Sequence, residues 1–187
     1  MRSIIAEYIR AIQPYDELER QHIAATLDWI ASGAPLFRIA RPDQPPQHLV
    51  SYFALVDDAA RKVLLVDHRR AGLWLPSGGH VEPDEDPAVT VEREVLEELG
   101  TPAIFRFAAP LFLTVTQTVG SHAGHTDVSL WYVLRGDATT PLAFDATEFY
   151  GVQWFDFDAV PFERADPHLR RFIVKLKHAL TSEGSRA

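Results

Sequence analysis

Hydrophobic positions repeat at helical spacing at both ends of the chain. The first 32 residues predict two helices, separated at Pro14 and ended by Gly33. Residues 166–182 repeat the pattern and predict a closing helix. The apolar positions of the two N-terminal helices are Ile4, Ile5, Tyr8, Ile9, Ile12, Ile23, Leu27 and Ile30.

The middle of the chain alternates between strand-like runs and turns. Residues 38–47 hold three prolines and predict a loop or linker before the first strand. A helical run stands among the strands, which favours an α/β or α+β fold. We therefore expect an N-terminal helical extension with its linker at residues 1–45 and a main domain at residues 46–187. The predicted strands are 48–57, 62–68, 73–76, 111–119, 126–136 and 152–157.

Composition narrows the classes of function. The formal net charge of -8 argues against a general nucleic-acid binder, which needs a basic surface, so no DNA binding is expected. The chain has no cysteine, which excludes thiolate metal sites and thiol nucleophiles. No apolar run reaches the length of a membrane span, and the N-terminus lacks the apolar region of a signal peptide. We expect a cytoplasmic protein that does not contact the membrane.

The stretch from Leu75 to Gly100 crowds carboxylates into one helix behind a glycine-rich turn. Asp86 is the expected N-cap, and the helix is expected to begin at Pro87. The glutamates at 94, 97 and 98 then share one face at i, i+3 and i+4. An apolar stripe lies about a quarter turn away: Ala88, Val91, Val95 and Leu99.

Two interpretations fit this acidic face. Acidic runs are common on solvated helix surfaces. Alternatively, three carboxylates beside a turn with inward carbonyls provide the oxygen ligands that Mg²⁺ binds in near-octahedral geometry.

The spacing favours the metal site. Gly79 is followed after five residues by Glu85, and after seven more by Arg93-Glu94-Val95-x-Glu97-Glu98-x-Gly100. This resembles the Nudix box, G-x5-E-x7-R-E-U-x-E-E-x-G-U, where U is bulky and aliphatic. The only departure is Thr101 at the final aliphatic position, which packs and binds no ligand. Ser77 stands where a further glycine is common in the family.

The resemblance to Nudix hydrolases implies a mixed β-sheet sandwiched between helices. It also implies hydrolysis of a nucleoside diphosphate linked to another moiety, or of a nucleoside triphosphate, with Mg²⁺ or Mn²⁺. The implied metal ligands are Glu94, Glu97, Glu98 and the carbonyl of Gly79. Arg93 would orient the glutamates and pair with Glu85.

The resemblance leaves the general base open among glutamates inside and outside the box. Glu148 is a candidate from outside, because it lies in the loop before a late strand, where family members can place a further glutamate. A solvated loop residue is the alternative interpretation.

Several other side chains are candidate substrate contacts, each with a structural alternative. His68, Arg69 and Arg70 are expected to meet phosphates, or else to form an exposed hairpin tip. The remaining candidates are His80, which could be a turn residue; His125 and Asp127, which could cap a strand edge; and Phe53 and Trp74, which could stack a base or pack in the core.

Three other functions are alternatives to a hydrolase. A non-catalytic nucleotide sensor on the same fold would usually lose box carboxylates, and this chain keeps them. An isomerase resembling the isopentenyl diphosphate isomerases would need a cysteine. A DNA-binding regulator would need an appended domain, whereas the N-terminal helices suggest a packing element or a homodimer contact, with a short lid over the cleft as the alternative. The substrate stays open among nucleoside triphosphates, damaged nucleotides, nucleotide sugars and capped RNA.

Overall fold

The computed structural model describes residues 1–40, 44–118 and 124–184, with side chains up to residue 182. The predicted strand 111–119 and the linker 38–47 therefore fall partly outside the described residues. No helix among the described residues is long and apolar enough to cross a membrane. The elements are α1 (Arg2–Ala11), α2 (Glu17–Ala31), β1 (Gln47–Asp57), β2 (Lys62–His68), β3 (Leu73–Leu75), β4 (Ser77–His80), α3 (Pro87–Leu99), β5 (Phe112–Gln117), β6 (Thr126–Arg135), β7 (Phe149–Asp156), a 3-10 turn (Phe162–Arg164) and α4 (Leu169–Gly184).

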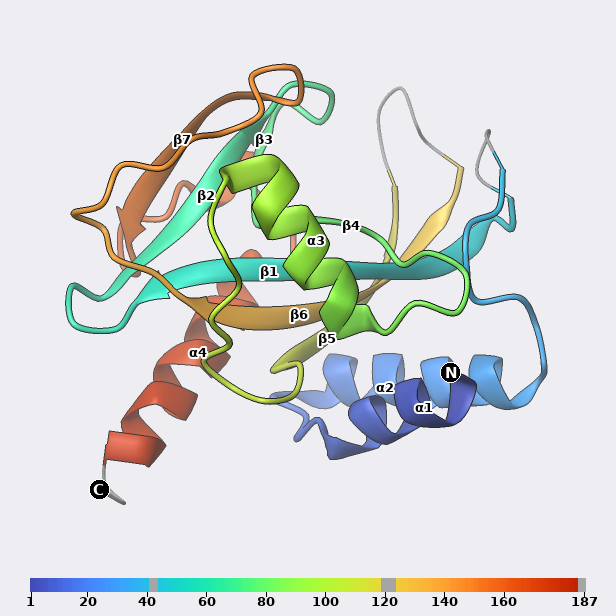
Figure 1. Ribbon diagram of the computed structural model, residues 1–187. Coiled ribbons are helices and arrows are strands. Elements are labelled where there is room, and N and C mark those ends of the chain that lie inside the picture. The colour runs from blue at the N-terminus through green and yellow to red at the C-terminus, as the bar shows by residue number, and fades with distance from the viewer. Residues whose placement is uncertain (41–43, 119–123, 185–187) are drawn as a thin grey trace.

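The strands form one mixed sheet, which confirms the predicted fold class. Its order is β3-β2-β1-β6-β5, with β4 also paired to β1 and β7 to β2. The pair β1 and β6 is parallel, and the other pairs are antiparallel. Figure 1 shows α3 crossing one side of the sheet, with α4 separated from it by the strands.

The sheet divides along β1. One edge of β1 pairs with β6 from Gln47 to Val56. The other edge pairs first with β4, over Val50–Phe53, and only at its end with β2, at Val56 and Asp57. Since β4 and β2 share this edge at different heights, they diverge and leave an opening between them.

Alternation along the strands produces two apolar layers, as period-2 side-chain direction requires. One layer lies between the sheet and α3 and includes Leu49, Phe53 and Leu55 of β1. The other lies against α4 and includes Ala54 and Val56 of the same strand. The first layer also takes in Ile5, Ile9 and Ile30 of the N-terminal helices, together with Val91, Val95 and Leu99 of α3.

Helix α2 covers the β5 edge of the sheet, where backbone groups would otherwise face water. The Glu19 carboxylate is fully buried and accepts the backbone N–H of Leu113, at 3.2 Å. Nδ1 of His22 accepts the N–H of Val115, at 3.3 Å. Two side chains of α2 therefore satisfy donors of the edge strand, and the N-terminal helices are packed into the fold. The division at residue 45 stays a prediction.

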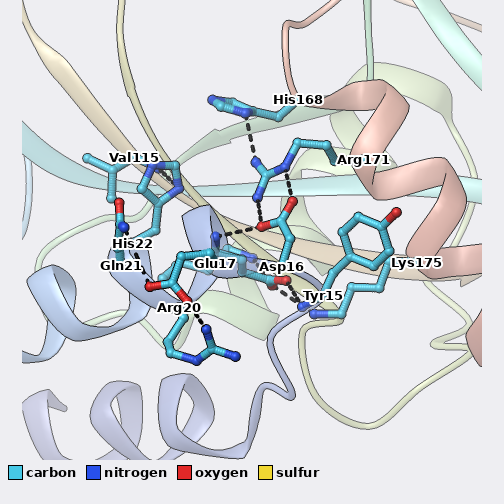
Figure 2. A network of polar contacts seen from close by, with 12 residues as sticks. Tyr15, Asp16, Glu17, Arg20, Gln21, His22, Val115, His168, Arg171 and Lys175 are labelled. Atoms are coloured by element: carbon cyan, nitrogen blue, oxygen red, sulfur yellow. Dashed lines mark hydrogen bonds and ion pairs between the residues drawn. The ribbon is translucent and has the colours of Figure 1, made fainter.

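Ion pairs fasten α2 to α4, as Figure 2 shows. Glu19 also accepts a hydrogen bond from Lys175, at 2.7 Å. Asp16, the N-cap of α2, binds the guanidinium of Arg171 through both oxygens, at 2.7 and 2.5 Å. These Arg171 hydrogen bonds lower the pKa of Asp16 to about 2. Arg171 in turn donates to Nδ1 of His168, at 2.9 Å, so this ring is held neutral.

Replacing Glu19 with alanine should destabilise the fold by about 3–5 kcal/mol, because it leaves the buried Lys175 ammonium unpaired. The edge N–H of Leu113 loses its acceptor at the same time. Urea unfolding of the variant and wild type measures the difference. The matched control is Glu17→Ala on the same helix, whose exposed pair with Arg20 should contribute less than about 1 kcal/mol. Equal losses in the two variants would contradict the role given to Glu19.

The free energy of unfolding should fall as the pH drops from about 6.5 to 4. Burial, with the charge of Arg171, lowers the pKa of His168 to about 4, and burial also lowers that of His22. An unfolded histidine binds its proton near pH 6.5, so the unfolded state gains protons first and stability is lost across that window.

The variant His168→Gln tests this dependence, because an amide can still accept from Arg171 but does not titrate. We expect it to remove about 1–2 kcal/mol of the acid-induced loss, allowing for the partial exposure of the ring. Urea unfolding at pH 7 and pH 4.5 measures it. An unchanged pH slope would show that this ring does not drive the loss.

Candidate active site

A cleft of about 690 Å³ opens where β4 and β2 diverge from β1. Its walls come from β1, β2, β4 and β6, from the acidic face of α3, and from the loop before β7. The polar and charged residues that line it are Arg38, His68, Arg70, Ser77, His80, Glu82, Glu94, Glu97, Glu98, Thr118, His125, Asp127 and Glu148.

Helix α3 has the predicted boundaries, and its ends are capped as its sequence indicates. Asp86 is the N-cap and accepts the backbone N–H of Ala88, at 2.9 Å, while Pro87 is the first helical residue. Gly100 ends the helix in the left-handed conformation, with φ of 62°. Its apolar stripe packs on the sheet, which turns the glutamates toward the cleft.

The two glycines before α3 allow unusually close approaches. A Cβ atom at Gly78 would lie 2.1 Å from the carbonyl oxygen of Ser51. A Cβ atom at Gly79 would lie 2.0 Å from Oε1 of Glu94. The sequence predicted a glycine-rich turn here, but these residues form strand β4 against β1. Glycine is needed because β1 and Glu94 occupy the space that a side chain would fill.

Arg93 joins the acidic residues of the box. It binds both oxygens of Glu85, at 3.2 and 3.1 Å, and donates to Oε1 of Glu94, at 2.6 Å. Its guanidinium also lies 3.7 Å from Glu97. Glu85 is held in turn by the hydroxyl of Thr90, at 2.7 Å. The pairing of Arg93 with Glu85 that the family resemblance implies is therefore present in the geometry.

The cleft carboxylates experience different environments. Glu98 is buried and accepts a hydrogen bond from the hydroxyl of Ser77. Burial, with the charges of Glu94 and Glu148, raises the pKa of Glu98 to about 8, although the Ser77 bond opposes the shift. Burial also raises the pKa of Glu94 against the effect of Arg93. Glu97 is 62% exposed and extends into solvent at the mouth of the cleft.

These residues fit a divalent hard cation. The pKa values of Glu94 and Glu98 are raised first by burial and then by the neighbouring carboxylates, and a bound cation would offset both effects. Oxygen donors from three carboxylates and the Gly79 carbonyl are the ligand types that Mg²⁺ and Mn²⁺ take. Arg93 neutralises only part of this charge. Its hydrogen bonds to carboxylates go to Glu85 and Glu94, and it makes none to Glu97 or Glu98.

Glu148 lines the cleft opposite the box, and its charge contributes to the raised pKa values of Glu94 and Glu98. Arg69 positions the loop that carries Glu148. The guanidinium of Arg69 donates to the carbonyls of Ala146 and Phe149, both at 2.9 Å, and its backbone N–H donates to that of Glu148. The expected phosphate contact of Arg69 stays a prediction: its Nε positions this loop, and the residue is not among those that line the cleft.

Two of the remaining candidates lie in the cleft and two lie in packed layers. His68 and Arg70 are among its lining residues. Phe53 is 1% exposed and belongs to the α3-side core, because odd-numbered residues of β1 point there while Val50 and Tyr52 face the cleft. The expected contact of Phe53 with substrate is corrected to a core role. Trp74 packs edge-on against Phe155, at 5.0 Å between ring centroids.

The structure brings His80, His125 and Asp127 together and adds His48, which sequence reasoning missed. His48 and Asp127 are direct neighbours in the parallel pair of β1 and β6. Burial lowers the pKa of His48, but the carboxylate of Asp127 and the carbonyl of Pro45 outweigh it, so the pKa is raised. His48 at the start of an apolar strand was a visible signal. Its partner Asp127 lies 79 positions later in the sequence, and only the pairing of β1 with β6 brings the two together.

Ser77 was also missed as a functional residue, although the sequence marked it as a departure from glycine. Its hydroxyl is the group that holds the buried Glu98. Arg38 and Thr118 line the cleft without any motif to reveal them.

Comparisons with known proteins agree with this geometry. The NUDIX domain family model matches residues 47–176, which is most of the chain. The human protein Nucleoside diphosphate-linked moiety X motif 6 is 31% identical over 107 residues, or 56% of this chain. The match spans only 33% of the human protein's own length.

Solved structures share the fold at lower identity. A MutT NUDIX hydrolase from Burkholderia pseudomallei has a TM-score of 0.53 and 23% identity, covering 69% of this chain and 97% of that one. The NUDIX domain of Shewanella oneidensis NrtR, solved with ADP ribose, has a TM-score of 0.57 and 20% identity, covering 72% and 88%. With the box geometry and the family match over residues 47–176, these comparisons show that the chain belongs to the Nudix hydrolase family.

Proposed function

We propose that this protein hydrolyses the diphosphate linkage of a nucleotide-like substrate with the help of Mg²⁺ or Mn²⁺. One observation carries the proposal: the glutamates 94, 97 and 98 line one cleft with the Gly79 strand, in an arrangement fixed by Arg93. The substrate is a nucleoside diphosphate linked to a further moiety, or a nucleoside triphosphate. The human relative's name refers to the first of these classes.

Glu94, Glu97, Glu98 and the Gly79 carbonyl would hold the cation. When bound, the cation offsets phosphate charge and lowers the pKa of a water. The chain's own contribution is to position groups, as is usual in phosphoryl chemistry. The Arg93–Glu85 pair holds Glu94 against Gly79, and Ser77 holds Glu98, so the ligands keep their places before substrate arrives.

A carboxylate in the cleft would take the proton of the attacking water. Glu148 and the box glutamates are the candidates. Glu148 has the advantage of a separate loop, which Arg69 keeps in place through two carbonyl bonds. His68, Arg70, His80, His125 and Asp127 line the same cleft and are the proposed substrate contacts.

A cytoplasmic location and a homodimer remain predictions. The competing function is a nucleotide sensor on the same fold. The NUDIX domain of NrtR was solved with ADP ribose, which is an example of ligand binding by such a domain. This chain keeps all the carboxylates of the box, which favours hydrolysis over binding alone.

Glu97→Gln should lower kcat by about 100- to 10,000-fold, because it removes one charge from the metal-holding face. The fold should be kept, since this side chain is 62% exposed. Steady-state kinetics and thermal melting of the same samples separate the two effects. The matched control is Glu92→Gln, an exposed glutamate on α3 outside the cleft lining, which should retain activity. A kcat for Glu97→Gln within a few-fold of wild type would rule out the metal-ligand role.

A substrate panel with purified protein tests the reaction class. It should contain nucleoside triphosphates, oxidised nucleotides, nucleotide sugars, ADP-ribose and dinucleoside polyphosphates, each with Mg²⁺ or Mn²⁺. We expect turnover of one class that stops in EDTA and returns when Mg²⁺ is added in excess. Activity that persists in EDTA would overturn the mechanism. Tight nucleotide binding without turnover of any class would support the sensor instead.

A further inference from the structure

Three histidines and one aspartate form a second group of potential metal ligands in the cleft, separate from the box glutamates. They are His48 on β1, His80 at the end of β4, His125 just before β6 and Asp127 on β6. One ligand atom from each lies within 4.8 Å of the others. The pairing of β1 with both β4 and β6 is what brings them together.

The buried rings of the group direct the same nitrogen inward. Nδ1 of His48 lies 3.0 Å from the carbonyl oxygen of Pro45, which can only accept, so this nitrogen carries the proton. The Thr118 hydroxyl lies 3.1 Å from both the carbonyl oxygen and Nδ1 of His125. With the hydroxyl hydrogen on the carbonyl, the matching tautomer of His125 is the one that donates from Nδ1. In their neutral forms both rings then present the Nε2 lone pair to Asp127.

Acceptors consequently face one another. Nε2 of His48 and Nε2 of His125 each lie 3.3 Å from Oδ1 of Asp127. His48 is fully buried, and among the described residues neither its Nε2 nor Oδ1 of Asp127 has a hydrogen bond of normal geometry. Lone pairs this close in a buried space repel unless a positive charge lies between them. A proton or a metal ion could supply it.

The distances favour a metal ion. A proton shared between imidazole and carboxylate would draw the atoms to about 2.7–2.9 Å. Tetrahedral zinc, with bonds of about 2.0–2.1 Å, keeps neighbouring ligand atoms about 3.3 Å apart. The rings of His48 and His125 are also stacked, at 5.0 Å and 22°, which disfavours charging both of them. The longest separation, up to 4.8 Å, would have to shorten as the ligands close on the ion.

The outward hydrogen bonds have the pattern of a metal site. Ligating histidines usually donate their other ring nitrogen to a carbonyl or another oxygen, which fixes the tautomer and the ring orientation. Pro45 and Thr118 provide these acceptors for His48 and His125. Imidazole ligands select zinc and its neighbours in the transition series, whereas Mg²⁺ prefers oxygen alone.

We propose that His48, His80, His125 and Asp127 bind one Zn²⁺ ion, chemically distinct from the hard cation at the box. The ion joins β4 to β1 and β6. It thereby fixes the strand that carries Gly79, one residue before His80. This inference does not depend on the proposed hydrolysis, because none of its four ligands is a box glutamate and it is tested by metal binding. It gives His80, His125 and Asp127 a metal-binding role in place of direct substrate contact.

The first experiment uses the full chain after removal of metals by chelation and dialysis. Isothermal titration with ZnCl₂ should give one zinc site per chain. The buffer contains Mg²⁺ in about 5- to 10-fold excess over the protein, so that the box glutamates are supplied with their own cation. Substitution with Co²⁺ should give the intense visible absorption of a four-coordinate ion. Saturating zinc, at about 100 times Kd, should raise Tm by about 5–10 °C. Failure of the wild type to bind zinc would overturn the proposal and indicate a shared proton.

Variants locate the ion. His125→Gln and Asp127→Asn should each weaken zinc binding at least about 100-fold, since loss of an outer partner alone costs about 10- to 100-fold. The matched control is His68→Gln, a cleft histidine outside the group, which should bind as wild type does. Glu97→Gln should also keep the zinc site. Circular dichroism of the metal-free proteins shows whether each variant is folded. If one of the two ligand variants does not fold, His80→Gln is tested in its place.

The pattern of losses decides the assignment. Zinc binding that survives in the folded His125→Gln and Asp127→Asn proteins would place the ion elsewhere and overturn the proposal. So would binding that disappears in Glu97→Gln, which would place zinc at the box. Loss of zinc in the histidine and aspartate variants, while Glu97→Gln still binds it, is the expected result whether or not any substrate is turned over.

Discussion

The candidate site depends on the hydrogen bonds that Arg93 donates to Glu85 and Glu94. Several carboxylates converge on a partly buried cleft, where their mutual repulsion is only weakly screened. One guanidinium, bound to Glu85 on one side and Glu94 on the other, holds them in register. Lysine could not replace it, because a single ammonium lacks the planar fork that binds two carboxylates at once. The remaining excess of negative charge is the property that supports the proposed cation site.

The sheet provides the space that this charge requires. Strand β1 pairs with β4 and β2 in succession along one edge, and the divergence of these two strands opens the cleft. The N-terminal helices stabilise the opposite edge of the sheet. Glu19 and His22 satisfy backbone donors of β5, and the Glu19–Lys175 and Asp16–Arg171 pairs attach α2 to α4. The sheet is therefore split between β4 and β2 at one edge, whereas α2 covers its other edge at β5.

Local features were predictable from the sequence, and features that depend on strand pairing were not. The limits of α3 and its caps follow from the local sequence of one helix, and the Arg93–Glu85 pair is the one that the family resemblance implies. The role of Phe53 was misassigned because one position along β1 separates the cleft from the core. His48 was missed because its contact with Asp127 requires the parallel register of β1 and β6. Nothing in the first 45 residues indicated that Glu19 would pair with Lys175, 156 positions away.

Strand β4 links the two groups of ligands chemically as well as in space. The backbone of Gly79 closely approaches the box residue Glu94, and the next residue, His80, adds an imidazole to the histidine group. Oxygen ligands favour magnesium and manganese, while imidazoles favour zinc, so adjacent sites can select different ions from the same solution. The short separation along β4 means that an ion bound at one group restrains the backbone of the other. The cleft would then hold two neighbouring proposed metal sites that share one strand.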